Sequence, residues 1–274
     1  MIDNSAEEIV RYYTEADEAS RLSTGWFQLE QARTRELILR HIHAAPATVL
    51  DIGGGAGAYA LWLASRGYQV HLVDAVPRHI EQARAASAHQ GRHPLASAAV
   101  GDARRLEHAD QTADAVLLLG PLYHLTQSQD RIRALQEAYR VLRSGGLVWA
   151  AGISRFASLL DSLSHGFFDQ PEFAPILDRD LSEGQHRNPT SNLAYFTEAF
   201  FYLPDELSAE VTEAGFESVE LVAIEGPGWL ARDFEGLWKR PEQRERLLAT
   251  LRKVEHEPTL IGASSHIMAV GRKG

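Results

Sequence analysis

Apolar residues between positions 48 and 154 follow two alternating patterns. Short apolar runs, typical of buried strands, cover residues 48–52, 69–75, 96–103, 114–120 and 147–154. Segments with helical signals lie between these runs, at residues 59–66, 77–89 and 130–143. Gly67 ends the first of these helices and Pro77 begins the second, as their backbone preferences favour. Strands that alternate with helices predict an α/β fold with a doubly wound, mostly parallel sheet.

The pattern changes on both sides of this region. Ser5 and Glu8 form a capping box that predicts a helix to about Glu18, and a looser helical spacing follows over residues 26–43. After about fifty residues without clear alternation, a helix begins at Pro204. A strand, a charged helix and a final strand are then predicted over residues 217–226, 240–253 and 265–272.

These changes divide the chain into four parts. Residues 1–46 form a helical cover, residues 47–153 the core of the sheet, residues 154–203 an insertion, and residues 204–274 the rest of the core sheet. The length of 274 residues suits one large domain that carries such an insertion.

Composition and charge exclude several classes of function. The net charge of −10 disfavours a general nucleic-acid surface, although a local basic pocket stays open. The absence of cysteine excludes disulfides, thiolate zinc sites and cysteine nucleophiles. The first residues lack the pattern of a signal peptide, and no apolar run is long enough to span a membrane. We therefore expect a cytoplasmic enzyme or binding protein with no nucleic-acid or membrane partner.

Residues 49–60, VLDIGGGAGAYA, place a glycine-rich turn between a strand and a helix. Main-chain N–H groups face a ligand at such a turn, and Gly53 and Gly55 would let the ligand approach closely. Asp51, Asp74 and Asp102 follow in order, each near the carboxyl end of a predicted strand. Any one of these acids has the alternative role of a cap or turn residue, and the glycines that of reversing the chain. Together they indicate a site for a nucleotide-like ligand.

The segment DIGGGAG resembles the DxGxGxG signature of class I S-adenosylmethionine-dependent methyltransferases. The segments VDAVPRHIEQAR, GDARRL and EAYRVLRSGGLV resemble the same family, so the likeness covers about residues 48–152. It implies a seven-stranded Rossmann-like methyltransferase fold and S-adenosylmethionine as cofactor. One departure is Gly54 in the middle of the loop, which we expect only to loosen it.

The resemblance also implies which residues bind the cofactor. At the methionine end these are Asp51, Gly53 and Gly55; at the ribose, Asp74 with Ala75; at the adenine, Asp102 and Ala103; and after the fourth strand, Gly120. The main rival is a nicotinamide or flavin dehydrogenase, because GGGAGA also reads as G-x-G-x-x-A. A dinucleotide makes no special demand for an acid at position 51, whereas a cationic amino-acid ligand does. The chain also shows no second fingerprint.

His124 is the candidate catalytic base. It follows the fourth strand in GPLYHL, and an imidazole is suited to taking a proton from an oxygen or nitrogen acceptor. The alternative is that His124 only closes over the cofactor. Methyl transfer is an in-line displacement, so the rest of the protein mainly supplies alignment. Tyr123 is a candidate for contact with the acceptor.

The insertion carries nine of the chain's 23 aromatic residues. This enrichment suggests an apolar lid over the open side of the cofactor site, while a small core of its own or a homodimer contact is the alternative. Candidate acceptor contacts are His165 and Phe168 in the insertion, and Tyr12, Tyr13, Arg21, Glu30 and Arg33 near the N-terminus. The histidines match no metal-ligand spacing, so no metal site is expected, although a catechol-type site assembled from distant acids stays open.

The sequence therefore predicts transfer of a methyl group from S-adenosylmethionine to a small-molecule acceptor. A first alternative is a protein or tRNA acceptor, which would need an exposed binding face. A second is a non-catalytic S-adenosylmethionine-binding protein or regulator, which would bind without turnover.

Overall fold

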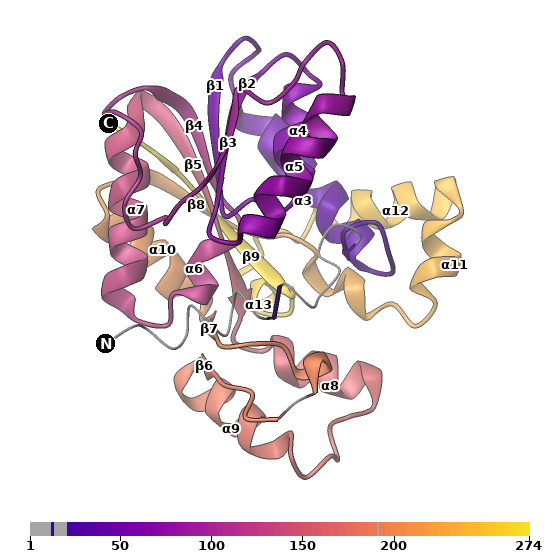
Figure 1. Ribbon diagram of the computed structural model, residues 1–274. Coiled ribbons are helices and arrows are strands. Elements are labelled where there is room, and N and C mark those ends of the chain that lie inside the picture. The colour runs from indigo at the N-terminus through magenta and orange to yellow at the C-terminus, as the bar shows by residue number, and fades with distance from the viewer. Residues whose placement is uncertain (1–11, 14–20, 191) are drawn as a thin grey trace.

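The computed structural model describes residues 12–13, 21–190 and 192–274. Five parallel strands lie in the order β3-β2-β1-β4-β5 (Figure 1). Their bounds are β1 (Thr48–Ile52), β2 (Gln69–Asp74), β3 (Ser97–Val100), β4 (Ala113–Leu118) and β5 (Leu142–Ser154). Beyond β5, β9 (His266–Arg272) runs antiparallel to it, and β8 (Glu217–Ala223) pairs antiparallel with β9. The predicted mostly parallel sheet and its seven strands are confirmed, and two further strands from the insertion bring the sheet of the described residues to nine.

Helices cover both faces of the sheet (Figure 1). On one face lie α3 (Phe27–His41), α4 (Ala58–Ala64) and α5 (Pro77–His89). The other face carries α7 (Ser128–Val141) and α10 (Pro204–Glu213). Leu37, Leu63 and Ile80 belong with Trp149 to the core of the first face, whereas Leu135 belongs to the core of the second. These buried stripes match the helical spacing in the sequence and hold the sheet between two apolar layers.

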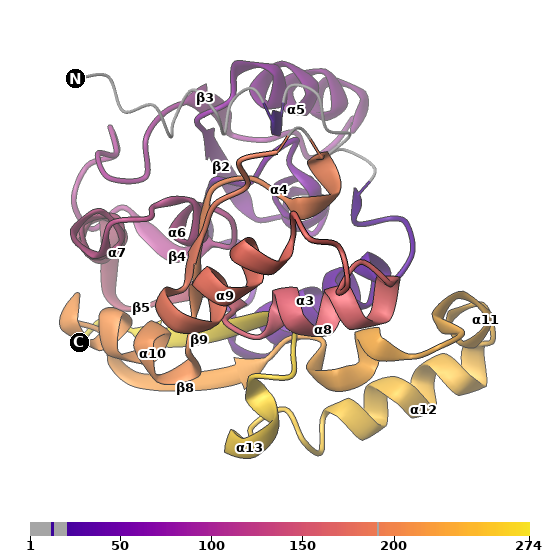
Figure 2. The ribbon, with the colours of Figure 1, turned by 90° about the horizontal axis from the view of Figure 1, so that it is seen from below.

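The insertion is partly built into the sheet, which the sequence did not predict. It holds α8 (Ala157–His165), α9 (Ala174–Glu183), β6 (Gln185–His186), the 3₁₀ helix η1 (Leu193–Tyr195) and β7 (Ala199–Tyr202). Ile153 of β5 pairs with Phe201 of β7 and also with His266 of β9, so β7 occupies the edge of β5 that β4 leaves after Leu118. Figure 2 views the molecule from the side where α8 and α9 lie.

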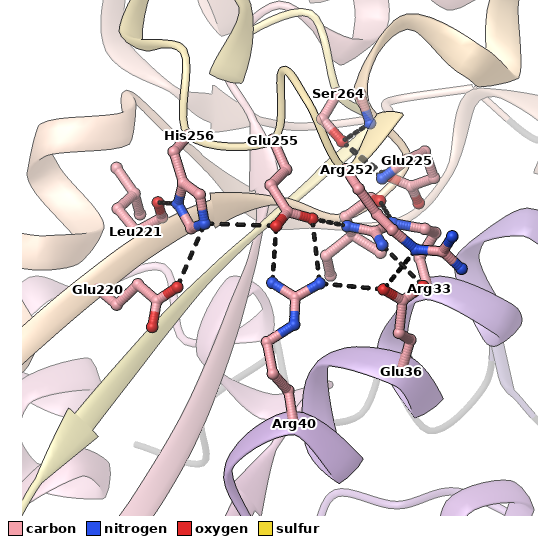
Figure 3. Close-up of polar contacts among 12 residues, drawn as sticks. Arg33, Glu36, Arg40, Glu220, Leu221, Glu225, Arg252, Glu255, His256 and Ser264 are labelled. Carbon is pink, nitrogen blue, oxygen red and sulfur yellow. Dashed lines mark hydrogen bonds and ion pairs between the residues drawn. The ribbon is translucent and has the colours of Figure 1, made fainter. Parts of the chain in front are cut away.

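The C-terminal third adds short elements after β8. They are η2 (Gly226–Leu230), α11 (Phe234–Trp238), α12 (Pro241–Leu251) and α13 (Pro258–Ile261), while α6 (Pro121–His124) follows β4. An ion network binds this region to α3 (Figure 3). The fully buried Arg33 bonds Glu255 and donates to the Ile224 carbonyl oxygen, and Arg40 Nη1 lies 2.6 Å from Glu255 Oε1. Arg33, a candidate acceptor contact from the sequence, is therefore a structural residue.

The predicted helix from Ser5 to Glu18 lies outside the described residues, apart from Tyr12 and Tyr13. Residues 144–146, which lie between the predicted helix at 130–143 and the predicted strand at 147–154, belong to β5, and the pairing with β4 shifts register there. Among the described residues, no helix combines the length and the apolar character needed to cross a membrane.

A glycine-lined cavity and an adjoining aromatic cavity

The glycine loop after β1 packs main chain against main chain. Gly53 has φ +68° and Gly55 has φ +58°, in the left-handed region that favours glycine. A Cβ atom on Gly53 would lie 2.6 Å from Pro121 Cδ, and one on Gly120 would lie 2.7 Å from the Gly53 carbonyl oxygen. Side chains at positions 53 and 120 would therefore separate the loop from the end of β4.

Asp51 lies fully buried beneath this loop. A Cβ atom on Gly54 would lie 2.5 Å from the Asp51 carboxylate, so the glycine there is a steric requirement and does more than loosen the loop. The Asp51 carboxylate lies near the Ala60 amide, but neither oxygen makes a hydrogen bond of good geometry to a described residue. Burial, and then the charge of Asp74, raise the pKa of Asp51 to about 7.

Asp74 ties the end of β2 to the glycine loop. Its Oδ2 accepts from the Gly55 amide at 2.8 Å, and its Oδ1 accepts from the Val76 amide at 2.8 Å. His79 Nδ1, which the sequence analysis missed, lies 3.1 Å from Oδ1. A carboxylate has about four acceptor positions, so Asp74 keeps capacity for a ligand hydroxyl.

The first cavity, called the glycine-lined cavity below, lies at the carboxyl ends of these strands and measures about 550 Å³. The structure brings most of the predicted cofactor residues to its wall. These are Gly53, Gly55, Asp74, Ala75, Asp102, Ala103 and Gly120. Asp51 is not among the lining residues because it lies below the loop. The Asp102 carboxylate is paired with Arg104, whose hydrogen bonds and charge outweigh burial and hold the Asp102 pKa below its usual value.

His124 also lines this cavity. Its Nε2 lies 2.7 Å from the Tyr13 hydroxyl oxygen, and its Nδ1 faces the Glu198 carbonyl oxygen at 3.4 Å. Since a carbonyl only accepts, Nδ1 carries the proton and Nε2 accepts from Tyr13. Burial lowers the pKa of His124 to about 4, which makes it a weak base. These contacts favour the closing role that the sequence analysis left open.

A second cavity of about 440 Å³, called the aromatic cavity below, adjoins the first. Among the described residues, four line both cavities: Tyr13, Arg21, Tyr123 and His266. Five rings of the insertion line the aromatic cavity: Phe167, Phe173, Tyr195, Phe196 and Phe201. Phe173 and Tyr195 also belong to a small core within the insertion, and Phe200 and Tyr202 to the main core. The aromatic enrichment thus serves both a cavity wall and packing.

The structure does not bring every predicted acceptor contact to a cavity. Tyr12 lines the aromatic cavity, where its ring centroid lies 5.6 Å from that of Phe196. Phe168 is 43% exposed and lines neither cavity. His165 is also absent from both walls and is paired with Asp161.

A polar group that the sequence analysis largely missed lies where the two cavities meet. His266 Nδ1 lies 2.7 Å from Glu225 Oε1 and 3.9 Å from Glu30 Oε2. Arg21 bonds both oxygens of Glu30, at 2.7 and 3.1 Å. The available sequence signal was an acid near the end of one predicted strand and a histidine near the start of the last, and their pairing becomes visible only in the folded sheet.

Comparisons with known proteins relate this chain to methyltransferases. Residues 49–146 match a family model described as a methyltransferase domain. The malonyl-[acyl-carrier protein] O-methyltransferase of Geobacter sulfurreducens is 33% identical over 196 residues, which cover 70% of this chain and 64% of the relative. The tRNA 5-carboxymethoxyuridine methyltransferase of Escherichia coli O157:H7 is 30% identical over 183 residues, covering 63% and 67%. An S-adenosylmethionine-dependent methyltransferase structure from Methanosarcina mazei aligns with a TM-score of 0.57 at 18% identity, covering 86% and 96%.

Proposed function

This chain belongs to the class I S-adenosylmethionine-dependent methyltransferases, and we propose that it methylates a small molecule held in the aromatic cavity. The observation that carries the proposal is the position of this cavity. It adjoins the glycine-lined cavity and shares four wall residues with it. An acceptor held there would lie beside the cofactor, which is the alignment that an in-line displacement needs.

S-adenosylmethionine is the cofactor of this family, and the glycine-lined cavity fits it. When bound, it supplies a methyl group already activated by a positively charged sulfur. The main chain at Gly53 and Gly55 allows close approach, and Asp74 offers acceptor capacity to the ribose hydroxyls. The buried Asp51 carboxyl is suited to offset the positive charge of the methionine end.

The wall of the aromatic cavity indicates the kind of acceptor. Seven of the described residues in this wall are aromatic side chains from the start of α3 or from the insertion: Trp26, Phe27, Phe167, Phe173, Tyr195, Phe196 and Phe201. Such a wall favours a molecule with an aromatic or aliphatic body. The Geobacter relative, by its name, methylates a carrier-bound malonyl group, and the Escherichia relative a tRNA base. The net charge of −10 disfavours a nucleic-acid acceptor for this chain.

The test is a radiolabel transfer assay with the purified full chain and methyl-labelled S-adenosylmethionine. The acceptors are a panel of phenols, hydroquinones, hydroxy acids and aromatic amines, with total tRNA and a protein extract in parallel. We expect label in an organic-extractable small product. Label found only in tRNA or protein would contradict the small-molecule proposal, and cofactor binding without transfer to anything would support the regulator alternative.

A further inference from the structure

Glu225 holds His266 in a fixed orientation. Glu225 is fully buried, and its Oε1 lies 2.7 Å from His266 Nδ1. Its Oε2 accepts from the Ser264 hydroxyl at 2.8 Å and from the His266 amide at 2.9 Å. Figure 3 shows the contact between Glu225 and Ser264. A carboxylate that bonds Nδ1–H fixes the tautomer of an imidazole and leaves Nε2 as the acceptor.

The free side of this imidazole faces the reaction space. His266 lines both cavities, and its Nε2 makes no hydrogen bond to a described residue. Two other histidines in the cavity walls have both ring nitrogens occupied. His124 Nε2 is bonded to Tyr13, and His186 is bonded through both nitrogens, to Asp180 and to the Tyr195 carbonyl oxygen. His79 is held by Asp74 at Nδ1 and also has an unbonded Nε2, but that nitrogen is buried and His79 lines only the glycine-lined cavity, away from the proposed acceptor site.

The charges around His266 increase its basicity. Burial lowers the pKa of His266, but the carboxylates of Glu30 on α3 and Glu225 after β8 outweigh it, so the pKa is raised. Arg21 partly offsets Glu30. Asp161 of α8 also lines the aromatic cavity, and burial raises its own pKa. His266 is therefore a stronger base than a free imidazole, in contrast to His124.

The same three side chains, Glu30, Glu225 and His266, also lie close enough together to suggest a metal site, with potential ligand atoms within 4.8 Å of one another. The observed partners argue against that use. Arg21 already bonds both oxygens of Glu30, while Ser264 and a main-chain amide bond Glu225. Protein donors thus satisfy the carboxylates, and a guanidinium takes the place that a second cation would need.

We propose that His266, held by Glu225, accepts the proton of a hydroxyl group on the acceptor, and that this acceptor is a phenol, hydroquinone or enol. This inference rests on the proposed function. The O–H bond breaks, its electron pair stays on oxygen, and the proton binds His266 Nε2. That oxygen pair then bonds the methyl carbon as the carbon–sulfur pair leaves with sulfur, and the proton passes from Nε2 to solvent. Acidic hydroxyls fit because proton transfer is efficient between groups of similar pKa.

The first experiment needs no acceptor. Histidine ring signals of isotope-labelled full-length protein are followed by NMR from pH 5 to pH 9, and His266 is assigned as the signal that His266→Gln loses. We expect the wild-type signal to titrate above 6.5 and to shift downward in Glu225→Gln. His93→Gln, a change of an exposed histidine between α5 and β3, is the matched control. A wild-type His266 that stays neutral, or a titration that Glu225→Gln leaves unchanged, overturns the pairing.

The second experiment uses hydroxyl acceptors from the labelling panel. At pH 7 we expect His266→Gln to lower kcat by 100- to 10,000-fold and Glu225→Gln by less, with S-adenosylhomocysteine affinity within threefold of wild type. The loss of kcat in His266→Gln relative to wild type should become smaller as the pH approaches the pKa of the acceptor hydroxyl, because the acceptor then ionises without a base. Added imidazole should restore part of the activity of His266→Ala.

The outcomes separate the two proposals. No transfer by the wild-type chain overturns the proposed function, and the role of His266 falls with it. Transfer by wild type and by His266→Gln at equal rates overturns only the role of His266. A loss that neither high pH nor imidazole relieves assigns His266 a structural role and overturns the proposal as well.

Discussion

The two cavities are built by different means. The wall of the glycine-lined cavity comes largely from strand ends between residues 52 and 125, where main chain and two acids shape the space. The aromatic cavity gathers side chains from the start of α3, the end of β5, the insertion and residues 265–266. A site built from main chain allows few residue types at each position, whereas a wall of side chains can be built from many combinations of aromatic residues. The first cavity is therefore marked in the sequence by a motif, and the second only by an enrichment in aromatic residues.

The largest expected effect is a loss of stability in the insertion, and it tests whether the insertion can be destabilised without the strands that form the glycine-lined cavity. Ile176 of α9 is buried in the insertion's core, so Ile176→Ala should cost about 3 kcal/mol of local stability. Leu181→Ala, on the same helix at an exposed position, is the matched control with less than about 0.5 kcal/mol. Hydrogen exchange should accelerate in residues 157–195 and stay unchanged in β1 to β4. Equal acceleration in both regions would contradict the separation.

The next effect concerns the cofactor side. Gly53→Ala places a methyl group 2.6 Å from Pro121 Cδ at a position with positive φ, so cofactor affinity should fall by about 2–3 kcal/mol. Gly91→Ala has a similar φ of +74° but open space around the new methyl group. Calorimetry with S-adenosylhomocysteine should therefore show no change for Gly91→Ala. Equal losses in the two variants would mean that backbone strain alone acts, without the contact to Pro121.

A substitution at Asp51 is expected to have opposite effects on the stability of the protein and on its affinity for the cofactor. Its pKa rises on folding from about 3.8 to about 7, so the folded state binds more protons and the free energy of unfolding decreases between pH 4 and pH 7. Asp51→Asn removes this titration and should stabilise the cofactor-free protein by about 2 kcal/mol at pH 8, with little gain below pH 4. The same change should weaken S-adenosylmethionine binding. Thermal unfolding at both pH values checks the first part; a variant that is less stable at pH 8 would contradict it.

The smallest expected effect distinguishes two neighbouring rings. Phe167 lines the aromatic cavity, whereas Phe168 is 43% exposed and lines neither cavity. Phe167→Ala should raise KM for the acceptor several-fold, and Phe168→Ala should change KM and stability by no more than about 0.5 kcal/mol. Steady-state kinetics with an acceptor from the panel would show the difference. A larger KM change for Phe168→Ala would restore it as an acceptor contact.

The sequence predicted the parts that local chemistry determines. The strand at residues 48–52 and the helix at 77–89 have the predicted bounds, because apolar runs and Pro77 specify them locally. The strands β6 and β7 escaped prediction because their place depends on where β4 ends beside β5. Aromatic content could not tell Phe167 from Phe168, since only the fold decides which ring faces the cavity.

The pairing of Glu225 with His266 could not be predicted from the sequence either, because it depends on the folded sheet. Glu225 and His266 are 41 residues apart along the chain and meet where β8 ends beside the start of the antiparallel strand β9. Each alone looks like an ordinary strand-end residue. His124, by contrast, stood next to a recognisable motif and attracted the catalytic prediction for that reason.

The pairing of β7 with β5 has a consequence for redesign of the enzyme. Main-chain hydrogen bonds at Ile153 and Ser154 anchor the insertion to the sheet, and Phe201 stands on that anchored strand with its ring in the cavity wall. The depth of the cavity at this point is set by a side chain on a rigid strand. Smaller or larger residues at position 201 should therefore change which acceptors fit, in steps of side-chain volume, while the cofactor residues keep their positions.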